Sequence, residues 1–354
     1  MVIYILLIVI LVFQGNTIHN RNVYAWITFL ELLLVAGLRL PVLGKGSDTE
    51  FYCDLYVSLS NSSISGIIST FRFETGFYLF CTFLTRISKN PQLLIFTTQA
   101  LMSGIVVYVI NKKSHIPWFS TVLYITLMYF FSSMNLMRYS IACSILFLSI
   151  DYIIRRKLLR FALLVLIAAQ FHFSAYIFLL SYFIYPLRLN KKNLFAIFVP
   201  FVIVFYSFMT FFQFLISFNS RYGSYQTDGE FAQSAFGNIL IFAVNFLFLM
   251  FVSFKSTQHL KDLNEENKFY YQAMMLGTLF SALAINVMIV GRFAAMFSIF
   301  SIIFIPNVIR TLPHYLRSKY IILMLIGSVA QVVVILTYRP EWYLVTPYRN
   351  FLFE

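Results

Sequence analysis

Charged residues are scarce in this chain. Only 11% of its 354 residues are Asp, Glu, Lys or Arg, whereas 60% are hydrophobic. In an average soluble domain, about a quarter of the residues are charged. The composition therefore excludes an ordinary soluble protein and predicts an all-α polytopic membrane protein.

Acidic residues are fewer still, with 13 Asp and Glu against 26 Lys and Arg and a net charge of +13. In a membrane protein an excess of basic residues mostly sets orientation, because Lys and Arg concentrate in cytoplasmic loops. The sequence contains no basic stripe with interleaved aromatic residues. No nucleic-acid partner is therefore expected.

Cysteine and the common catalytic motifs are also lacking. Three cysteines without paired spacing provide neither a disulfide framework nor a zinc site. The sequence has no P-loop, no G-x-G-x-x-G, no G-x-S-x-G and no H-E-x-x-H motif. These absences argue against nucleotide-driven chemistry and against hydrolases of those types, and no cofactor is expected.

Apolar runs separated by short polar joints are abundant. Most approach the roughly 20 residues that a helix needs to cross a bilayer core. They cover residues 2–14, 23–40, 92–110, 117–133, 137–154, 161–185, 194–218, 237–254, 269–288, 292–309 and 320–338. We expect about 11–12 transmembrane or re-entrant helices. The prediction is a single domain, 1–354, with external loops at 41–74 and 219–236.

The joints richest in Lys and Arg are predicted to be cytoplasmic. Keeping them there requires residues 161–185 to form a bent or re-entrant hairpin with His172 near its outer tip. The apolar stretch 75–88 is too short to cross and is predicted to lie at the interface or to re-enter. A single continuous span over 161–185 is the competing interpretation, and it would invert the rest of the chain.

Isolated cations stand at the ends of apolar runs, on the predicted external face. They are Arg39, Arg138, His172, Arg221 and Arg292. A cation beside hydrocarbon is costly unless it has a partner or a task. The guanidinium group of Arg presents a rigid fork of donors that matches phosphate oxygens. The pattern predicts a site for a phosphate-bearing, lipid-linked substrate, and the alternative is that these side chains only anchor helix ends at the interface.

Other residues could complete such a site. Asp48, two residues before Glu50, is a candidate general base; the pair could instead bind a divalent metal or be solvated loop acids. His172 is a candidate acid, base or phosphate contact, or else a hydrogen-bonded core residue. Asn135 shares a helix side with Arg138. Tyrosines that could stack on sugar rings are Tyr52, Tyr222, Tyr225 and Tyr348.

Several short motifs resemble those of the EpsG-like family of polysaccharide polymerases. Residues 37–39 read GLR and 46–52 read GSDTEFY, similar to G-L-R followed by G-x-D-x-x-x-Y. Residues 74–77 (ETGF) resemble a step of Glu-x-Gly followed by Phe or Tyr. Residues 135–142 (NLMRYSIA) resemble N-x-x-R-Q-x-I/L-A, with Tyr139 in place of Gln. Residues 171–175 (FHFSA) are similar to F-H-x-S-A, with Phe173 where Pro is common.

Further matching features are Arg221 with Tyr222 and Tyr225, Arg292 after Gly291, and Tyr348 after Pro347. The ordered set spans most of the chain, from about residue 37 to residue 348. The resemblance implies a Wzy-type O-antigen or capsule polymerase, a metal-independent glycosyltransferase of the GT-C superfamily, in the bacterial inner membrane.

Such a polymerase transfers a glycan from undecaprenyl diphosphate to a new lipid-linked repeat unit at the periplasmic face. The resemblance thus implies that Arg39, Arg138, Arg292 and Arg221 bind the diphosphate. Asp48, His172 and Glu74 are then the catalytic candidates. The expected partners are the lipid-linked donor and acceptor and the membrane lipids, and they could include a chain-length-regulating co-polymerase.

Three other activities remain open. An O-antigen ligase would use the same donor with a lipid A-core acceptor. A flippase or transporter for the lipid-linked oligosaccharide would show inverted repeats and broken helices at midplane depth, whereas the polar groups here gather at one face. A membrane acyltransferase would leave His172 as its lone catalytic candidate.

Overall fold

The protein is described by a computed structural model whose described part is mostly helical. That part comprises residues 1–41, 47–61, 74–189, 242–250, 263–285 and 290–353, with single positions at 199, 203, 207 and 239. Among these residues no strand forms, and Arg39 and Asn350 make an isolated antiparallel bridge. The prediction of an all-α polytopic membrane protein is confirmed.

Three helical segments of the described part are long and apolar enough to cross a membrane. They are Gln92–Lys113, Val290–Thr311 and His314–Tyr338. These segments correspond to the predicted runs 92–110, 292–309 and 320–338. The first and the third are single helices, and the second is interrupted by a turn between Ser298 and Ser301. Most of the predicted run 194–218 lies outside the described residues, whereas residues 242–250 of the predicted run 237–254 are described and helical.

The chain divides into two compact units. The first consists of Met1–Ser149, Leu163–Tyr176 and Ile302–Glu354, and the second of Ile150–Ala162 and Ile177–Ser301. Each unit is described by itself below. The prediction of one membrane domain over 1–354 stays a prediction.

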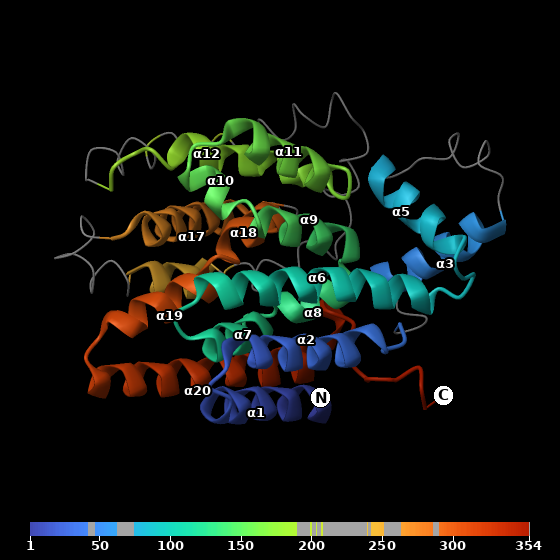
Figure 1. Cartoon of the computed structure of the whole chain (residues 1–354), viewed down its shortest axis with the longest axis horizontal. Helices are drawn as coiled ribbons and strands as arrows, with labels where there is room; N and C mark the ends of the chain where they lie inside the picture. Colours follow the sequence, from blue (N-terminus) through green and yellow to red (C-terminus); the bar gives the residue numbers. More distant parts are fainter. Residues whose placement is uncertain are drawn as a thin grey trace. The chain divides into compact units, whose positions relative to one another are not determined.

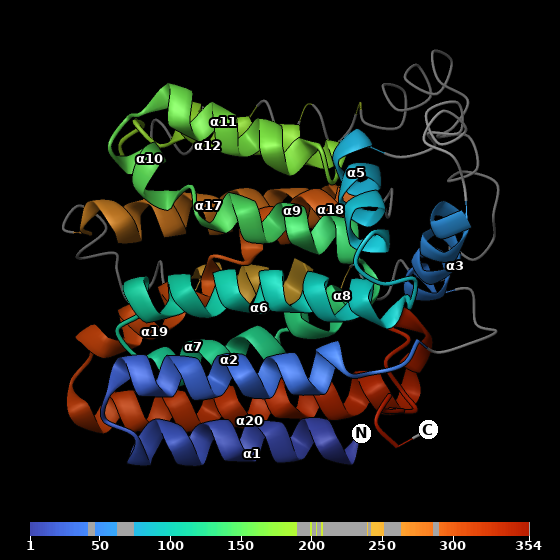
Figure 2. The same ribbon diagram turned by 45° about the vertical axis from the view of Figure 1, so that its right-hand side comes forward.

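The first unit contains most of the described helices. In chain order they are α1 (Val2–Thr17), α2 (Arg21–Gly37), α3 (Asp48–Asn61), α5 (Thr75–Thr85), α6 (Gln92–Lys113), α7 (Pro117–Thr126), α8 (Tyr129–Asn135), α9 (Met137–Phe147), α19 (Ser301–Thr311, from its second residue) and α20 (His314–Tyr338). Figures 1 and 2 both show α1, α2, α6 and α20 with roughly parallel axes.

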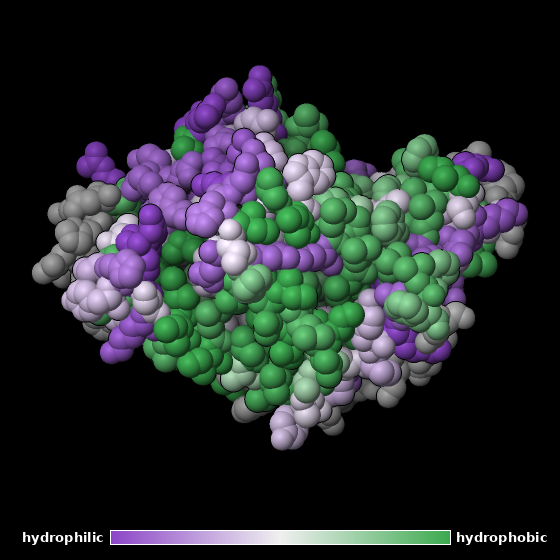
Figure 3. Space-filling view, turned by 60° about the horizontal axis from the view of Figure 1, so that its bottom comes forward, coloured by the Kyte–Doolittle hydropathy of each residue, from purple (hydrophilic) through white to green (hydrophobic). Residues whose placement is uncertain are grey.

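The outer faces of α1 and α20 are hydrophobic. Leu6 and Phe13 of α1 are more than half exposed, and so are Leu323 and Ile326 of α20. Figure 3 turns this side toward the viewer, and hydrophobic residues cover most of its lower part. An apolar outer face of this kind suits contact with lipid.

The second unit contains α10 (Ile150–Ile154), α12 (Leu180–Ile184), α17 (Glu265–Leu283) and α18 (Val290–Ser298). Helices α17 and α18 approach closely at Gly277, where an added Cβ would lie 2.2 Å from the Ser298 Oγ atom. Stacked aromatic rings fill the core, with Phe178 centred 5.2 Å from Phe297 and 5.7 Å from Phe300.

The predicted hairpin over residues 161–185 is confirmed as a chain reversal. Helix α11 (Leu158–Ala169) ends in a turn, and the chain continues as the 3-10 helix η1 (Phe173–Leu179) and then α12. On the return path Tyr182 meets Arg156, donating a hydrogen bond from its hydroxyl to the Arg156 carbonyl at 3.0 Å. The rings of Phe161 and Tyr182 stack at 5.4 Å. His172 lies in the turn, as predicted.

The short stretch 75–88 contains one short helix, and its place at the interface stays a prediction. It forms α5, an 11-residue helix. At 1.5 Å per residue, this helix is roughly 16 Å long, about half of a bilayer core. Helix α5 therefore cannot cross a membrane alone.

Two predicted runs, 117–133 and 137–154, are wrong as continuous helices. The first is broken at Met128, which has a φ of 70° and separates α7 from α8. The second is broken between α9 and α10, where the Ser149 hydroxyl donates to the Leu146 carbonyl at 2.6 Å. Such local side-chain bonds compete with the helical ladder.

Part of the region 41–74, which the sequence interpretation treats as a loop, is also helical. Residues Asp48–Asn61 form α3. The Ser47 hydroxyl accepts a hydrogen bond from the backbone N–H of Glu50 at 3.1 Å and so caps the helix. The sequence S-D-T-E at 47–50 matches the capping-box pattern, a signal for a helix start at this position. The second predicted loop, 219–236, lies outside the described residues.

Candidate functional site

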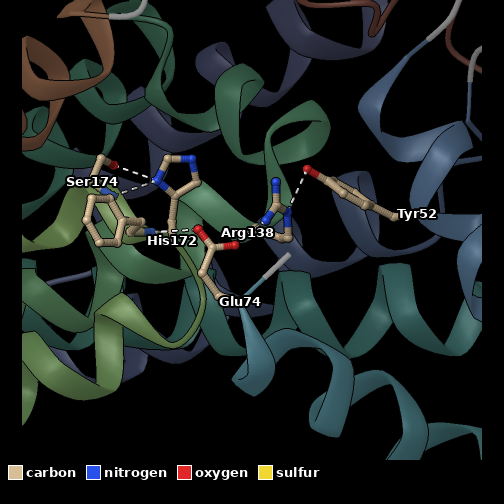
Figure 4. A network of polar contacts seen from close by, with 6 residues as sticks. Tyr52, Glu74, Arg138, His172 and Ser174 are labelled. Atoms are coloured by element: carbon tan, nitrogen blue, oxygen red, sulfur yellow. Dashed lines mark hydrogen bonds and ion pairs between the residues drawn. The ribbon is translucent and has the colours of Figure 1, made fainter. Parts of the chain in front are cut away.

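Arg138 is the best-anchored of the predicted phosphate-binding residues. It is the second residue of α9, and its side chain is 11% exposed. Its Nε atom donates to the Tyr52 hydroxyl at 3.1 Å, and its Nη1 atom forms an ion pair with the Glu74 Oε2 atom. The guanidinium also lies 5.5 Å from the ring centre of Tyr52 and 5.9 Å from that of Phe77. Figure 4 shows Tyr52 and Glu74 reaching Arg138 from different elements.

Glu74 connects Arg138 to the turn that carries His172. While its Oε2 atom pairs with Arg138, its Oε1 atom accepts a hydrogen bond from the backbone N–H of Phe173 at 2.7 Å. Glu74 occupies the position before α5, but its side chain makes no capping bond to that helix. The carboxylate is committed instead to α9 on one side and to the turn on the other, as Figure 4 shows.

The start of α5 rests directly on that turn. The backbone N–H of Phe77 donates to the Gln170 carbonyl at 3.2 Å. Only glycine fits at position 76, because an added Cβ would lie 2.5 Å from the Gln170 Cβ and 2.8 Å from its carbonyl oxygen. The E-x-G step thus has a physical basis: the glycine permits the close approach that places the glutamate between Arg138 and the turn.

His172 is held by its own turn. Its Nδ1 atom lies 2.5 Å from the Ser174 hydroxyl and 3.3 Å from the Ser174 backbone nitrogen. The imidazole packs edge-on against Tyr139, with ring centres 5.5 Å apart. Tyr139 follows Arg138 on α9, so α9 contacts both the guanidinium site and the histidine turn.

Arg39 lies just beyond α2 and is buried, with 3% of its surface exposed. Its Nη2 atom donates to the Thr49 hydroxyl at 3.0 Å, and that hydroxyl donates to the Met134 carbonyl at 2.7 Å. The buried Arg39 Nε atom has no hydrogen-bond partner among the described residues. The Asn135 side-chain oxygen accepts from the Thr49 backbone N–H at 3.4 Å. A predicted cation therefore sits in the core with an unused donor.

The C-terminal tail covers this cation. The backbone N–H of Leu40 donates to the Arg349 carbonyl at 3.0 Å, and that of Phe351 to the Leu38 carbonyl at 2.8 Å. Tyr348 is half-buried next to Arg39: burial raises the pKa of Tyr348, while its bond to Asn350 and the charge of Arg39 lower it. These contacts between the tail and residues 38–40 are backbone hydrogen bonds, which a pattern of side chains in the sequence does not predict.

Helix α3 joins the two arginine sites. Thr49 holds Arg39, and Tyr52, three residues later on the same side of the helix, holds Arg138. Asp48 is the first residue of α3, next to Thr49. Tyr52 is buried, with its ring against Phe77. The predicted contact of Tyr52 with a glycan stays a prediction.

The structure thus brings together eight of the predicted residues within the first unit. They are Arg39, Asp48, Tyr52, Glu74, Asn135, Arg138, His172 and Tyr348. Arg292 is the third residue of α18 and belongs to the second unit. Arg221, Tyr222 and Tyr225 lie outside the described residues.

The sequence analysis did not identify the residues that form hydrogen bonds to the predicted site residues. Thr49 and Ser174 make bonds that depend on tertiary packing, although both stand inside the motifs at 46–52 and 171–175. In the described part of the chain, no group of three or more His, Cys, Asp or Glu could hold a metal ion. Metal independence stays a prediction. Buried guanidinium donors close to a carboxylate and a histidine are suited to bind an anion and to move a proton beside it.

The chain matches a known protein family over most of its length. The family model described as the EpsG family matches residues 22–350. This range includes every residue of the site named above. No curated protein and no solved structure matches the chain.

Proposed function

Because the chain belongs to the EpsG family, we propose that it is a polysaccharide polymerase, a glycosyltransferase of the membrane. It lengthens a glycan by transferring it from undecaprenyl diphosphate to the non-reducing end of a new lipid-linked repeat unit. The site faces the periplasm from the bacterial inner membrane, and the fold is of the GT-C type. Family membership supports the general class, and the chemistry of the site supports the substrate.

The observation that carries this proposal is the attachment of Arg39 and Arg138 to one helix, α3, through Thr49 and Tyr52. Arg39 keeps a buried Nε donor without a protein partner among the described residues. Leaving a buried polar group unpaired costs about 1–3 kcal/mol, and more when the group is charged. An anionic ligand would satisfy that donor, and a diphosphate can engage two guanidinium groups at once.

In the proposed reaction, a hydroxyl oxygen of the acceptor sugar bonds to the anomeric carbon of the donor glycan. The bond between that carbon and the diphosphate oxygen breaks, and undecaprenyl diphosphate leaves with the electron pair. The hydroxyl proton passes to the carboxylate of Asp48, at the start of α3. Arg39 and Arg138 stabilise the charge that accumulates on the leaving diphosphate. The growing glycan is the donor and the new repeat unit is the acceptor.

The test uses the purified protein and lipid-linked repeat units. A ladder of progressively longer glycans supports the polymerase. A single transfer to lipid A-core, without a ladder, would identify a ligase instead. Movement of the lipid-linked units across a vesicle membrane without a new glycosidic bond would identify a transporter. Either of these last two results overturns the proposal.

A further inference from the structure

The hydrogen bonds around His172 decide which of its ring nitrogens carries the proton. The backbone N–H of Ser174 points at the Nδ1 atom, with 3.3 Å between the two nitrogens. A backbone N–H can only donate, so Nδ1 must accept. The Ser174 hydroxyl, 2.5 Å from the same atom, can donate as well. A neutral imidazole has one donor and one acceptor nitrogen, so its proton must lie on Nε2.

This arrangement is built into the turn. His172 directly precedes η1 and Ser174 is the second residue of η1, where the chain reverses. The turn is fixed from outside by Glu74, which accepts the Phe173 N–H, and by the bond from Phe77 to Gln170. The packing of the imidazole against Tyr139 adds a third restraint. A ring flip would place the Cδ2–H group where Nδ1 lies, so the Ser174 N–H would lose its acceptor, which the turn disfavours.

We propose that Ser174 fixes His172 as a hydrogen-bond donor through Nε2–H, and that His172 serves the substrate's anionic group in this way and not as a base. The inference rests on the proposed function for the identity of the anion, a phosphate oxygen of the lipid-linked donor. Glu74 and Ser174 are then positioning residues. Glu74 couples the histidine turn to Arg138, because one of its oxygens accepts from the turn and the other pairs with the guanidinium.

Two substitutions separate a donor from a base. In His172→Gln the amide can place an N–H donor near the Nε2 position, but it cannot accept a proton. In His172→Ala both capacities are lost. A donor role predicts that His172→Gln extends glycans at least tenfold faster than His172→Ala. A base role predicts that both variants are equally slow. His172→Asn is the geometric control, because its shorter amide reaches only the Nδ1 position and should resemble His172→Ala.

The pH dependence of the extension rate is a second test. A base loses activity when acid protonates it, whereas imidazolium keeps its Nε2–H and remains a donor. Removing His172 should therefore leave the acidic limb of the extension rate in place. Disappearance of that limb in His172→Gln would overturn the proposal.

The tautomer itself can be measured without any activity. In the full protein labelled with ¹⁵N-histidine, the resonance that disappears in His172→Gln should show a protonated Nε2 and an unprotonated Nδ1. A protonated Nδ1 at neutral pH would overturn the inference even if the wild type makes a full ladder. If the wild type makes no ladder, the proposed function fails, while the tautomer measurement still tests what Ser174 does.

Discussion

Gly76 is the position at which packing of α5 against the histidine turn can be tested most directly. In Gly76→Ala the new Cβ would lie 2.5 Å from the Gln170 Cβ and 2.8 Å from the Gln170 carbonyl oxygen. Because the second atom belongs to the backbone, a side-chain rotation cannot relieve the contact. The two segments must move apart, and the bond from the Phe77 N–H to the same carbonyl, 3.2 Å long, must weaken.

Overpacking by one methyl group costs about 1–3 kcal/mol. A lost hydrogen bond adds about 0.5–1.5 kcal/mol. A displacement of the turn also moves Glu74 and the imidazole relative to Arg138, and misplacement by about 1 Å can cost roughly 10²-fold in rate. We expect Gly76→Ala to lower the thermal unfolding temperature in detergent and to slow extension by tenfold or more.

Gly327 of α20 provides the matched control, because an added Cβ there meets no atom within 4 Å. Gly327→Ala should leave extension unchanged and stabilise its helix by about 0.8–1 kcal/mol. In a Gly76→Ala, Gln170→Gly double variant the contact between the two Cβ atoms is removed but the carbonyl remains, so recovery should be partial. Wild-type extension and unfolding temperature in Gly76→Ala would refute the described packing.

Three further substitutions test the charged groups. Arg138→Lys should slow extension by about tenfold or more, because one ammonium group cannot reproduce the guanidinium contacts with both Tyr52 and Glu74. A hydrogen bond to a charged group contributes about 1.5–3 kcal/mol. Polymer of full length from this variant would contradict the prediction. Asp48→Asn should retain binding of the lipid-linked substrate but slow extension by ~10²–10⁴-fold, and a native rate would show that the base lies elsewhere. Glu74→Gln should slow extension, because its amide can turn an N–H donor toward Arg138. The control Glu341→Gln changes an exposed ion pair and should extend glycans at the wild-type rate. Equal extension rates in the two variants would exclude a role for the Glu74 charge.

The sequence predicts the cations and the hairpin because both follow from the cost of charge beside hydrocarbon. Arg138 stands alone in its apolar run, and such a residue needs a partner, which the structure supplies as Glu74 from a different segment. Basic joints at both ends of 161–185 require the chain to turn back, and contacts of Tyr182 with Arg156 show that it does. These constraints act locally, so they can be recognised without knowing the fold.

Other features depend on packing that no local pattern records. Helix α3 was predicted to be a loop, although the capping sequence at 47–50 marks its first turn. The tail reaches residues 38–40 through backbone bonds across more than 300 residues of sequence, and backbone bonds carry no residue signature. The helix break at Met128 has a positive φ, which a non-glycine residue rarely adopts. Nothing in the apolar run 117–133 therefore indicated a break at this residue.

Arg39 and Arg138 differ in the protein contacts that a bound phosphate would replace. Arg138 already has an anionic partner in Glu74, so a phosphate at its guanidinium must compete with or share that carboxylate. Among the residues that the structure describes, the Arg39 guanidinium bonds to the neutral hydroxyl of Thr49 alone, and it retains a buried donor. A ligand oxygen at Arg39 therefore replaces no protein contact, and the gain there is the larger of the two. Helix α3 contacts both arginines, so a shift of α3 that changes one contact also moves the other. In the proposed site, the geometry of phosphate binding would therefore depend on the first turn of α3.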